Sequence, residues 1–181
     1  KGWNGILRGL AQEAMDTLKN GGDLDVRAHH VCVGLFNIPG KEASNGKSFH
    51  SGYIGLDPRF HFLTLGKVPE RSSFALNFSV FHEIAHQLQY WTGDPFFTGQ
   101  DRRPLELAAD CASGALLRLR WAGLRKDIWE NEVRGIRASI GAISGKARPI
   151  VRDSDFHGTA LEREAAFLAG LRIGAKLQAA S

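Results

Sequence analysis

The sequence predicts a single α+β domain in which helices dominate, and three observations lead to that prediction. Short apolar runs that suit β-strands occur before residue 70, whereas amphipathic helical patterns fill most of the chain after it. The length of 181 residues suits one compact domain with its own core, so residues 1–181 are expected to form one unit. No internal repeat or low-complexity tract divides the chain.

The first half of the chain is predicted to contain one helix followed by short strands. Residues 5–19 carry apolar side chains at helical spacing, and a glycine pair stops that pattern. Residues 30–38 (HVCVGLFNI) and 59–66 (RFHFLTLG) are apolar runs that indicate two strands. Between them, residues 40–52 (GKEASNGKSFHSG) are rich in Gly, Ser and Asn, which predicts a mobile loop.

Two helices are predicted in the centre of the chain. The first follows Ser72 and Ser73, either of which can cap it, because a serine hydroxyl accepts an unpaired backbone N–H. Its apolar residues recur at helical spacing up to Leu88, and Gly93 ends it. The second helix opens at Pro104, since the first helical turn tolerates proline.

Two further helices are predicted toward the C-terminus. Apolar residues from Leu124 to Ile140 recur at helical spacing and indicate the first of them. Thr159 and Glu162 form a capping box, in which each side chain satisfies a backbone N–H near the other residue. This pair predicts the start of the last helix, which is expected to run through Leu177.

The stretch FHEIAHQLQY, residues 81–90, carries a pattern that suits a zinc site. His82 and His86 are four residues apart, so on a helix both imidazoles face one metal ion. A catalytic zinc site adds one more protein ligand and keeps one position for water. Glu83 adjoins the first histidine and is the candidate general base that takes a proton from that water.

The next helix supplies the predicted third ligand. Glu106 lies 20 positions after His86 and completes a set of two histidines and one glutamate. Asp110 is one helical turn further and is expected to accept the N–H of a ligand histidine. Asp94 and Asp101, in the connection before this helix, are the alternative oxygen ligands. The HExxHxxGxxH pattern would place a third histidine ligand at position 92 of this chain. That residue is Thr92, so a third histidine ligand is excluded.

His157 is the remaining candidate for chemistry. It stands in DFHGT, directly before the predicted last helix, where an adjacent glycine favours an exposed side chain. A histidine in this place can donate a hydrogen bond to the oxyanion that forms when water attacks an amide. An exposed loop histidine without such a role is the alternative. The other four histidines show no partner pattern and are expected to be structural or surface residues; they are His29, His30, His50 and His61.

Three blocks of the sequence resemble the bacterial neutral zinc metallopeptidases, a gluzincin-like family. The blocks are HEIAHQLQ, LELAADCASG and FHGTALEREAAFLAG, and their order and approximate spacing match over roughly residues 75–175. The chain departs from the family at Ala85, where a glycine is usual, and lacks its acidic and cysteine-bearing segments. The resemblance implies a zincin-like metallopeptidase domain with a small sheet and an active-site helix.

The resemblance also implies roles for individual residues. His82, His86 and Glu106 would bind Zn²⁺, Glu83 would be the base, and Asp110 would hold a ligand histidine. The same resemblance implies a catalytic role for His157, and it places Arg163, Phe167 and Gly170 on further positions of the third block. The expected substrate is a peptide or protein. A zinc-containing binding or regulatory domain without catalysis is the alternative, although such a domain has no use for Glu83.

Composition limits the partners and leaves the compartment open. The net charge is +4, and the basic residues between positions 118 and 152 alternate with acidic ones, so we expect solvated helix faces and no nucleic-acid partner. The chain begins with Lys1 and not with Met, so a signal peptide or membrane anchor could have been removed, and the resembled family often carries one. Cys32 and Cys111 allow at most one disulfide, and each is expected to be a buried, inert thiol.

Overall fold

The structure is a computed structural model that describes residues 32–35, 46–48, 53–56, 75–92, 102–144 and 157–180. These residues form a small sheet and four helices, which confirms the predicted helix-dominated α+β class. The elements are β1 (Cys32–Leu35), β2 (Gly46–Ser48), β3 (Tyr53–Leu56), α2 (Ala75–Thr92), α3 (Arg103–Arg120), α4 (Lys126–Ile143) and α5 (Ala160–Ala180). The helix expected over residues 5–19 and the strand expected over residues 59–66 lie outside the described residues.

The sheet has three strands in the order β1-β3-β2. Strand β3 pairs in parallel with β1, with Cys32 opposite Tyr53, and antiparallel with β2, with Gly46 opposite Leu56. The predicted loop over residues 40–52 is therefore wrong at Gly46–Ser48. Gly, Lys and Ser have weak intrinsic strand preference, so the pairing with β3 stabilises this edge strand and its own sequence pattern does not.

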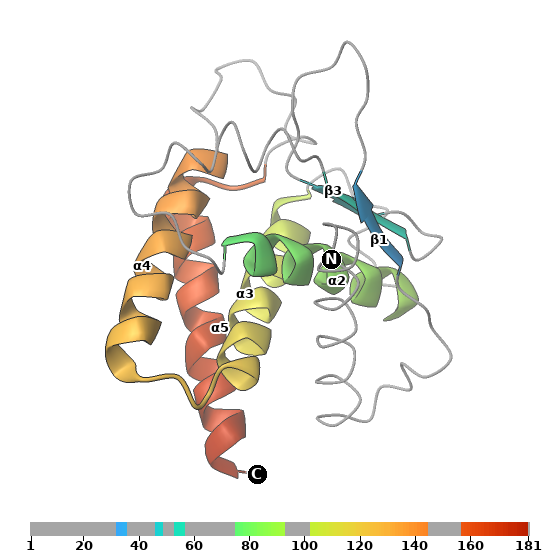
Figure 1. The fold of residues 1–181 in the computed structure, drawn as a ribbon. Coiled ribbons are helices and arrows are strands. Elements are labelled where there is room, and N and C mark those ends of the chain that lie inside the picture. Colours follow the sequence, from blue (N-terminus) through green and yellow to red (C-terminus); the bar gives the residue numbers. More distant parts are fainter. Residues whose placement is uncertain are drawn as a thin grey trace.

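Helix α2 is the central element of the fold. Its apolar residues surround most of the helix axis, which is typical of a helix buried on all sides rather than one lying on the surface. Figure 1 shows α2 between the sheet and the helices α3 and α5, and α2 contacts β2, β3, α3 and α4. Polar side chains in the middle of α2, such as His82 and Glu83, are consequently held inside the domain, whereas Gln89 and Tyr90 near its end are half-buried.

The hydrophobic core joins α2 to the sheet and to the other three helices. Phe78 on α2 and Phe167 on α5 pack edge to face, with ring centroids 5.5 Å apart, and Phe78 also contacts the His82 ring at 6.1 Å. The core therefore reaches the histidine pair directly. Its fully or nearly fully buried members are Ile54, Leu56, Phe78, Val80, Phe81, Ile84, Leu116, Leu117, Ile136, Ile140 and Phe167.

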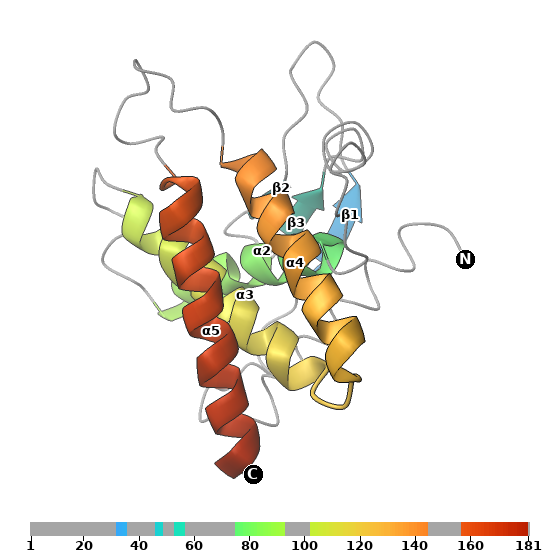
Figure 2. The ribbon, with the colours of Figure 1, turned by 90° about the vertical axis from the view of Figure 1, so that its left-hand side faces the viewer.

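Helices α3 and α5 form the most extensive helix pair among the described elements, and Figure 2 shows them crossing closely. Gly170 of α5 permits this approach, because a β-carbon at that position would clash with the backbone carbonyl of Cys111. Cys111 itself is a free, partly buried thiol. The crossing point thus adjoins Asp110, the residue before Cys111.

The predicted helix boundaries in the second half agree with the structure. Proline occupies the first turn of α3, as the sequence indicates. At the start of α5 the Glu162 backbone N–H donates to the Thr159 hydroxyl at 3.2 Å, and the Thr159 N–H donates to Glu162 Oε2 at 2.8 Å, which confirms the capping box. No helix within the described residues is both long and apolar enough to span a bilayer.

Candidate metal centre

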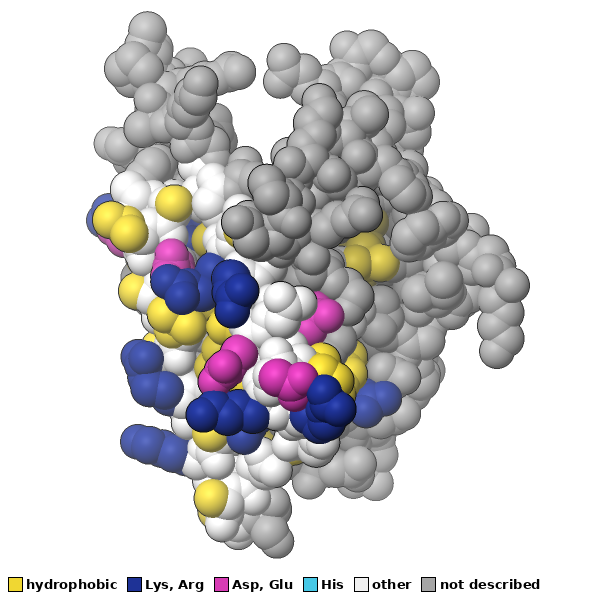
Figure 3. Space-filling view, turned by 60° about the vertical axis from the view of Figure 1, so that its left-hand side comes forward, with side chains coloured by type: hydrophobic (Ala, Val, Ile, Leu, Met, Phe, Trp, Pro, Cys, Tyr) yellow, Lys and Arg dark blue, Asp and Glu magenta, His cyan; other side chains and the backbone are white. Residues whose placement is uncertain are grey.

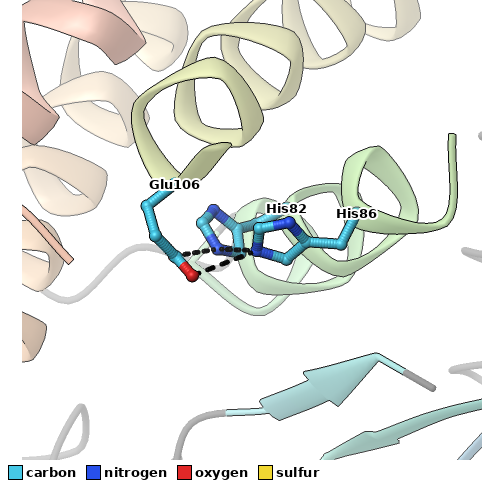
Figure 4. A group of neighbouring side chains, drawn as sticks. All are labelled: His82, His86 and Glu106. Carbon is cyan, nitrogen blue, oxygen red and sulfur yellow. Dashed lines mark hydrogen bonds and ion pairs between the residues drawn. The ribbon is translucent and has the colours of Figure 1, made fainter. Parts of the chain in front are cut away.

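Helices α2 and α3 bring three potential metal ligands to one point. His82 and His86 extend from the same face of α2, one turn apart, and Glu106 reaches toward them from the first turn of α3 (Figure 4). One ligand atom from each of the three residues lies within 4.8 Å of the other two. Among the described residues, this buried group could hold a metal ion.

The distances within the group match those expected around a single metal ion. His82 Nε2 lies 3.1 Å from His86 Nε2 and 3.1 Å from Glu106 Oε2, and His86 Nε2 lies 3.5 Å from Glu106 Oε1. Tetrahedral coordination with bonds of about 2.0–2.1 Å separates neighbouring ligand atoms by roughly 3.3 Å. The two histidines approach different oxygens of the Glu106 carboxylate, and each of the three separations is close to that value. The three side chains are therefore near enough to one another to share one metal ion.

Both imidazoles are held with Nε2 directed toward the common point. His82 Nδ1 donates to Asp110 Oδ1 at 2.9 Å. His86 Nδ1 donates to Gln89 Oε1 at 2.7 Å, and the Gln89 amide is itself anchored by donating to the Leu105 carbonyl at 2.9 Å. Because each Nδ1 carries the N–H, each Nε2 can present its lone pair to a metal, which is the usual arrangement of metal-binding histidines.

The electrostatics of the group favour a cation at its centre. Burial opposes the charged form of His82, yet the hydrogen bonds to Asp110 and Glu106 outweigh it and raise the pKa of His82 to about 10. Burial also opposes ionisation of Glu106, but its contacts with His82 and His86 hold the pKa of that carboxyl well below its usual range. Positive charge is thus stabilised between these side chains, whether a proton or a metal ion supplies it.

Asp110 lies where α3, α2 and α5 meet. Its side chain is completely buried, and it contacts His82 as the spacing from Glu106 suggested. Burial opposes ionisation of Asp110, but hydrogen bonds from Arg163 and His82 lower the pKa of its carboxyl. Asp110 is therefore held as a carboxylate that accepts the His82 N–H.

Two polar partners of the site were not predicted as such: the family resemblance placed Arg163 on its third block without a role, and Gln89 was not singled out. Arg163 on α5 donates from Nε to Asp110 Oδ2 at 2.7 Å and from Nη2 to Asp110 Oδ1 at 2.8 Å. The signal that could have located it is its spacing, because Arg163, Phe167 and Gly170 share one face of α5 at helical intervals, and all three are buried. Gln89 could have been found from its position three residues after His86.

The two candidate catalytic residues lie outside the group of three potential metal ligands. Glu83 follows His82 on α2 and is buried. His157 lies at the rim, with its side chain 56 % exposed and Nε2 3.6 Å from Glu106 Oε1. Gly158 has a φ of 91°, a backbone conformation that L side chains rarely adopt, and this turn places His157 beside the first turn of α5.

The remaining sequence candidates cannot be placed. Asp94, Asp101 and the histidines of the first half lie outside the described residues.

Comparisons with protein-family models, with curated proteins and with solved structures each found no match to this chain.

Proposed function

We propose that the chain is a zinc-dependent metallopeptidase with a zincin-like catalytic domain, and that it hydrolyses bonds in peptide or protein substrates. The observation that carries the proposal is the convergence of two Nε2 atoms and one carboxylate, with both Nδ1 atoms anchored. Two imidazoles and one glutamate are a donor set that zinc accepts in catalytic sites. Three protein ligands leave a coordination position open, as catalysis requires.

The proposed chemistry assigns one task to each side chain. Bound Zn²⁺ supplies a Lewis acid that makes water acidic and polarises a carbonyl. Glu83 takes the proton of the attacking water and passes it to the leaving amine. His157 at the rim donates a hydrogen bond to the carbonyl oxygen as negative charge develops there. His82, His86 and Glu106 would hold the metal, and Asp110 would orient His82.

Surface charge supports a peptide substrate more than a nucleic acid. Figure 3 shows basic and acidic side chains interleaved on one face of the C-terminal helices. Arg125 contacts Asp127 at 2.6 Å, and Arg137 contacts Glu164 at 2.5 Å, so these basic groups already have acidic partners. A nucleic-acid surface needs basic groups that are available to phosphates, commonly with aromatic platforms for the bases.

The test combines metal analysis with a peptide assay on protein purified without a histidine tag. We expect about one equivalent of zinc and hydrolysis of an internally quenched peptide library that a chelator abolishes. Glu83→Gln is the matched variant, because the amide keeps the shape of glutamate and loses its basic oxygen. We expect it to keep zinc and lose hydrolysis. Iron at one equivalent would instead indicate a two-histidine, one-carboxylate iron site and overturn the proposal.

A further inference from the structure

Three helices are linked to the metal centre through one chain of buried polar side chains. Arg163 of α5 contacts Asp110 of α3, and Asp110 contacts His82 of α2, whose other ring nitrogen faces Glu106. Arg163 is only 3 % exposed and Asp110 is not exposed at all. The order of contacts is therefore arginine, aspartate, histidine and then the metal-binding point.

The Arg163–Asp110 contact balances the charge of Asp110 and also fixes the orientation of its carboxylate. One N–H of the guanidinium donates to each carboxylate oxygen, at 2.7 and 2.8 Å. Such a two-point contact fixes the plane of a carboxylate, because the guanidinium fork is rigid and planar. Asp110 Oδ1 accepts hydrogen bonds from both Arg163 Nη2 and His82 Nδ1. Without Arg163, the buried carboxylate would keep one donor and could rotate about its side-chain bonds.

We propose that Arg163 is a positioning residue of the metal centre, which acts through Asp110 to fix the orientation of the His82 imidazole and hence its Nε2 ligand atom. This inference rests on the metal-binding role proposed above. It assigns to α5 a part in the site, although α5 contributes no ligand to the group of three.

A purely structural role for Arg163 would be to tie α5 to α3. That packing has another support, since Gly170 lies against the Cys111 backbone of α3. Phe167 also holds α5 in place by packing edge to face on Phe78 of α2. A structural tie predicts a loss of stability with unchanged metal binding by the folded protein. A positioning role predicts a change in metal affinity and in ligand geometry. The two roles are therefore separable by measurement.

The experiment uses Zn²⁺ and Co²⁺ alone as probes of the full chain. Zinc affinity is measured by competition with a chromophoric chelator, and the visible spectrum of bound Co²⁺ reports the coordination geometry. We expect Arg163→Met to weaken zinc binding by ~10–100-fold, the range for loss of an outer partner of a ligand, and to alter the Co²⁺ spectrum. Arg163→Lys keeps the charge and loses the fork, so we expect a smaller loss.

The control variant is Arg137→Met. Arg137 also contacts α5, through Glu164, but the Arg137 side chain is 49 % exposed and its ion pair with Glu164 is separate from the Arg163–Asp110 contact. We expect this variant to show the affinity and the Co²⁺ spectrum of the unaltered protein. Unchanged affinity and spectrum in Arg163→Met, alongside normal metal binding by the unaltered protein, would overturn the inference and leave the metal centre intact.

A double variant covers the case in which Arg163→Met does not fold, because removing one partner of a buried ion pair leaves an unpaired charge. Asp110→Asn with Arg163→Met removes both charges and keeps an oxygen acceptor for His82. If Arg163 acts only through Asp110, the double variant should bind zinc as weakly as Asp110→Asn does, since the two losses do not add. A further loss in the double variant would contradict the inference. Failure of the unaltered protein to bind zinc would overturn both proposals.

Discussion

At the scale of single residues, His82 has a different environment at each ring nitrogen. Nδ1 faces a wholly buried carboxylate, whereas Nε2 faces His86 and Glu106. These acceptors stabilise an added proton on His82 strongly, as the pKa of about 10 shows. In the proposed metal-bound state, Nδ1 keeps its N–H to Asp110 and Nε2 would bind the metal in place of a proton.

The first residue-level prediction concerns the third ligand. Glu106→Ala should weaken zinc binding by more than the ~10–100-fold expected for loss of an outer partner, because a carboxylate in the ligand group is removed. Asp94→Ala, which alters the rival oxygen ligand, should leave the affinity nearly unchanged. Competition with a chelator measures both variants. The reverse order of effects would make Asp94 the ligand and would contradict the gluzincin-like resemblance.

The second residue-level prediction concerns His157. Its exposed side chain lies beside Glu106 without joining the ligand group, so His157→Ala should retain zinc. We expect a lower kcat with a modest change in KM, because the proposed contact strengthens as charge develops on the substrate. Steady-state kinetics on a cleaved peptide separates the two constants. An effect on KM alone would instead identify His157 as a substrate-binding residue.

The candidate site was largely predictable where its residues follow helical spacing. His82 and His86 are four apart, and Asp110 is four after Glu106, so the chain itself places each pair on one face. The role of Arg163 was not predictable in this way, since it lies 53 positions from Asp110 in the sequence. Its contact depends on how α5 crosses α3, which local pattern does not determine.

At the scale of elements, the crossing of α3 and α5 determines where Arg163 meets Asp110. Gly170 lies against the backbone of Cys111, which follows Asp110 directly. The two helices therefore approach each other closely beside the residue that contacts His82. A change in the separation of these helices should affect both the stability of the domain and the metal site.

Gly170→Ala tests this crossing. The new β-carbon would clash with the Cys111 carbonyl oxygen, which is backbone and cannot rotate away, so the helices must separate. We expect the free energy of unfolding to fall by about 1–3 kcal/mol or more, the usual cost of overpacking. Denaturant unfolding followed by circular dichroism measures the change.

Gly141→Ala provides the matched control. Gly141 is an exposed glycine of α4, and a β-carbon there meets nothing within 4 Å. We expect a gain of up to about 1 kcal/mol, because alanine favours helix over glycine. Equal losses in the two variants would show that the tight crossing at Gly170 is not the cause.

The elements themselves were predictable to different degrees. The helices α2 to α5 carry clear apolar spacing and boundary residues such as Pro104 and the Thr159–Glu162 capping box, so their approximate extents follow from local signals. Strand β2 lacks such a signal, because Gly46–Ser48 contains no β-branched or aromatic residue. Its conformation depends on pairing with β3, a contact that the local sequence does not encode.

At the scale of the whole molecule, the metal-binding point joins elements that are distant in the sequence. His82 and His86 belong to α2, Glu106 and Asp110 to α3, and Arg163 to α5. These helices also share the hydrophobic core through contacts such as Phe78 with Phe167. A metal ion at this point would therefore bind the folded arrangement of three helices and not the unfolded chain.

The last prediction follows from that linkage. A ligand that binds only the folded state stabilises it by about 2.7 kcal/mol when its free concentration is about 100 times its Kd. For a domain of this size, roughly 2–4 °C in Tm accompanies each kcal/mol, so buffered zinc should raise Tm by about 5–11 °C over the chelated protein. Mg²⁺ should have little effect, because it prefers oxygen ligands. Thermal unfolding of the Glu106→Ala variant is the control, and an equal zinc-dependent rise in that variant would mean that zinc binds elsewhere on the chain.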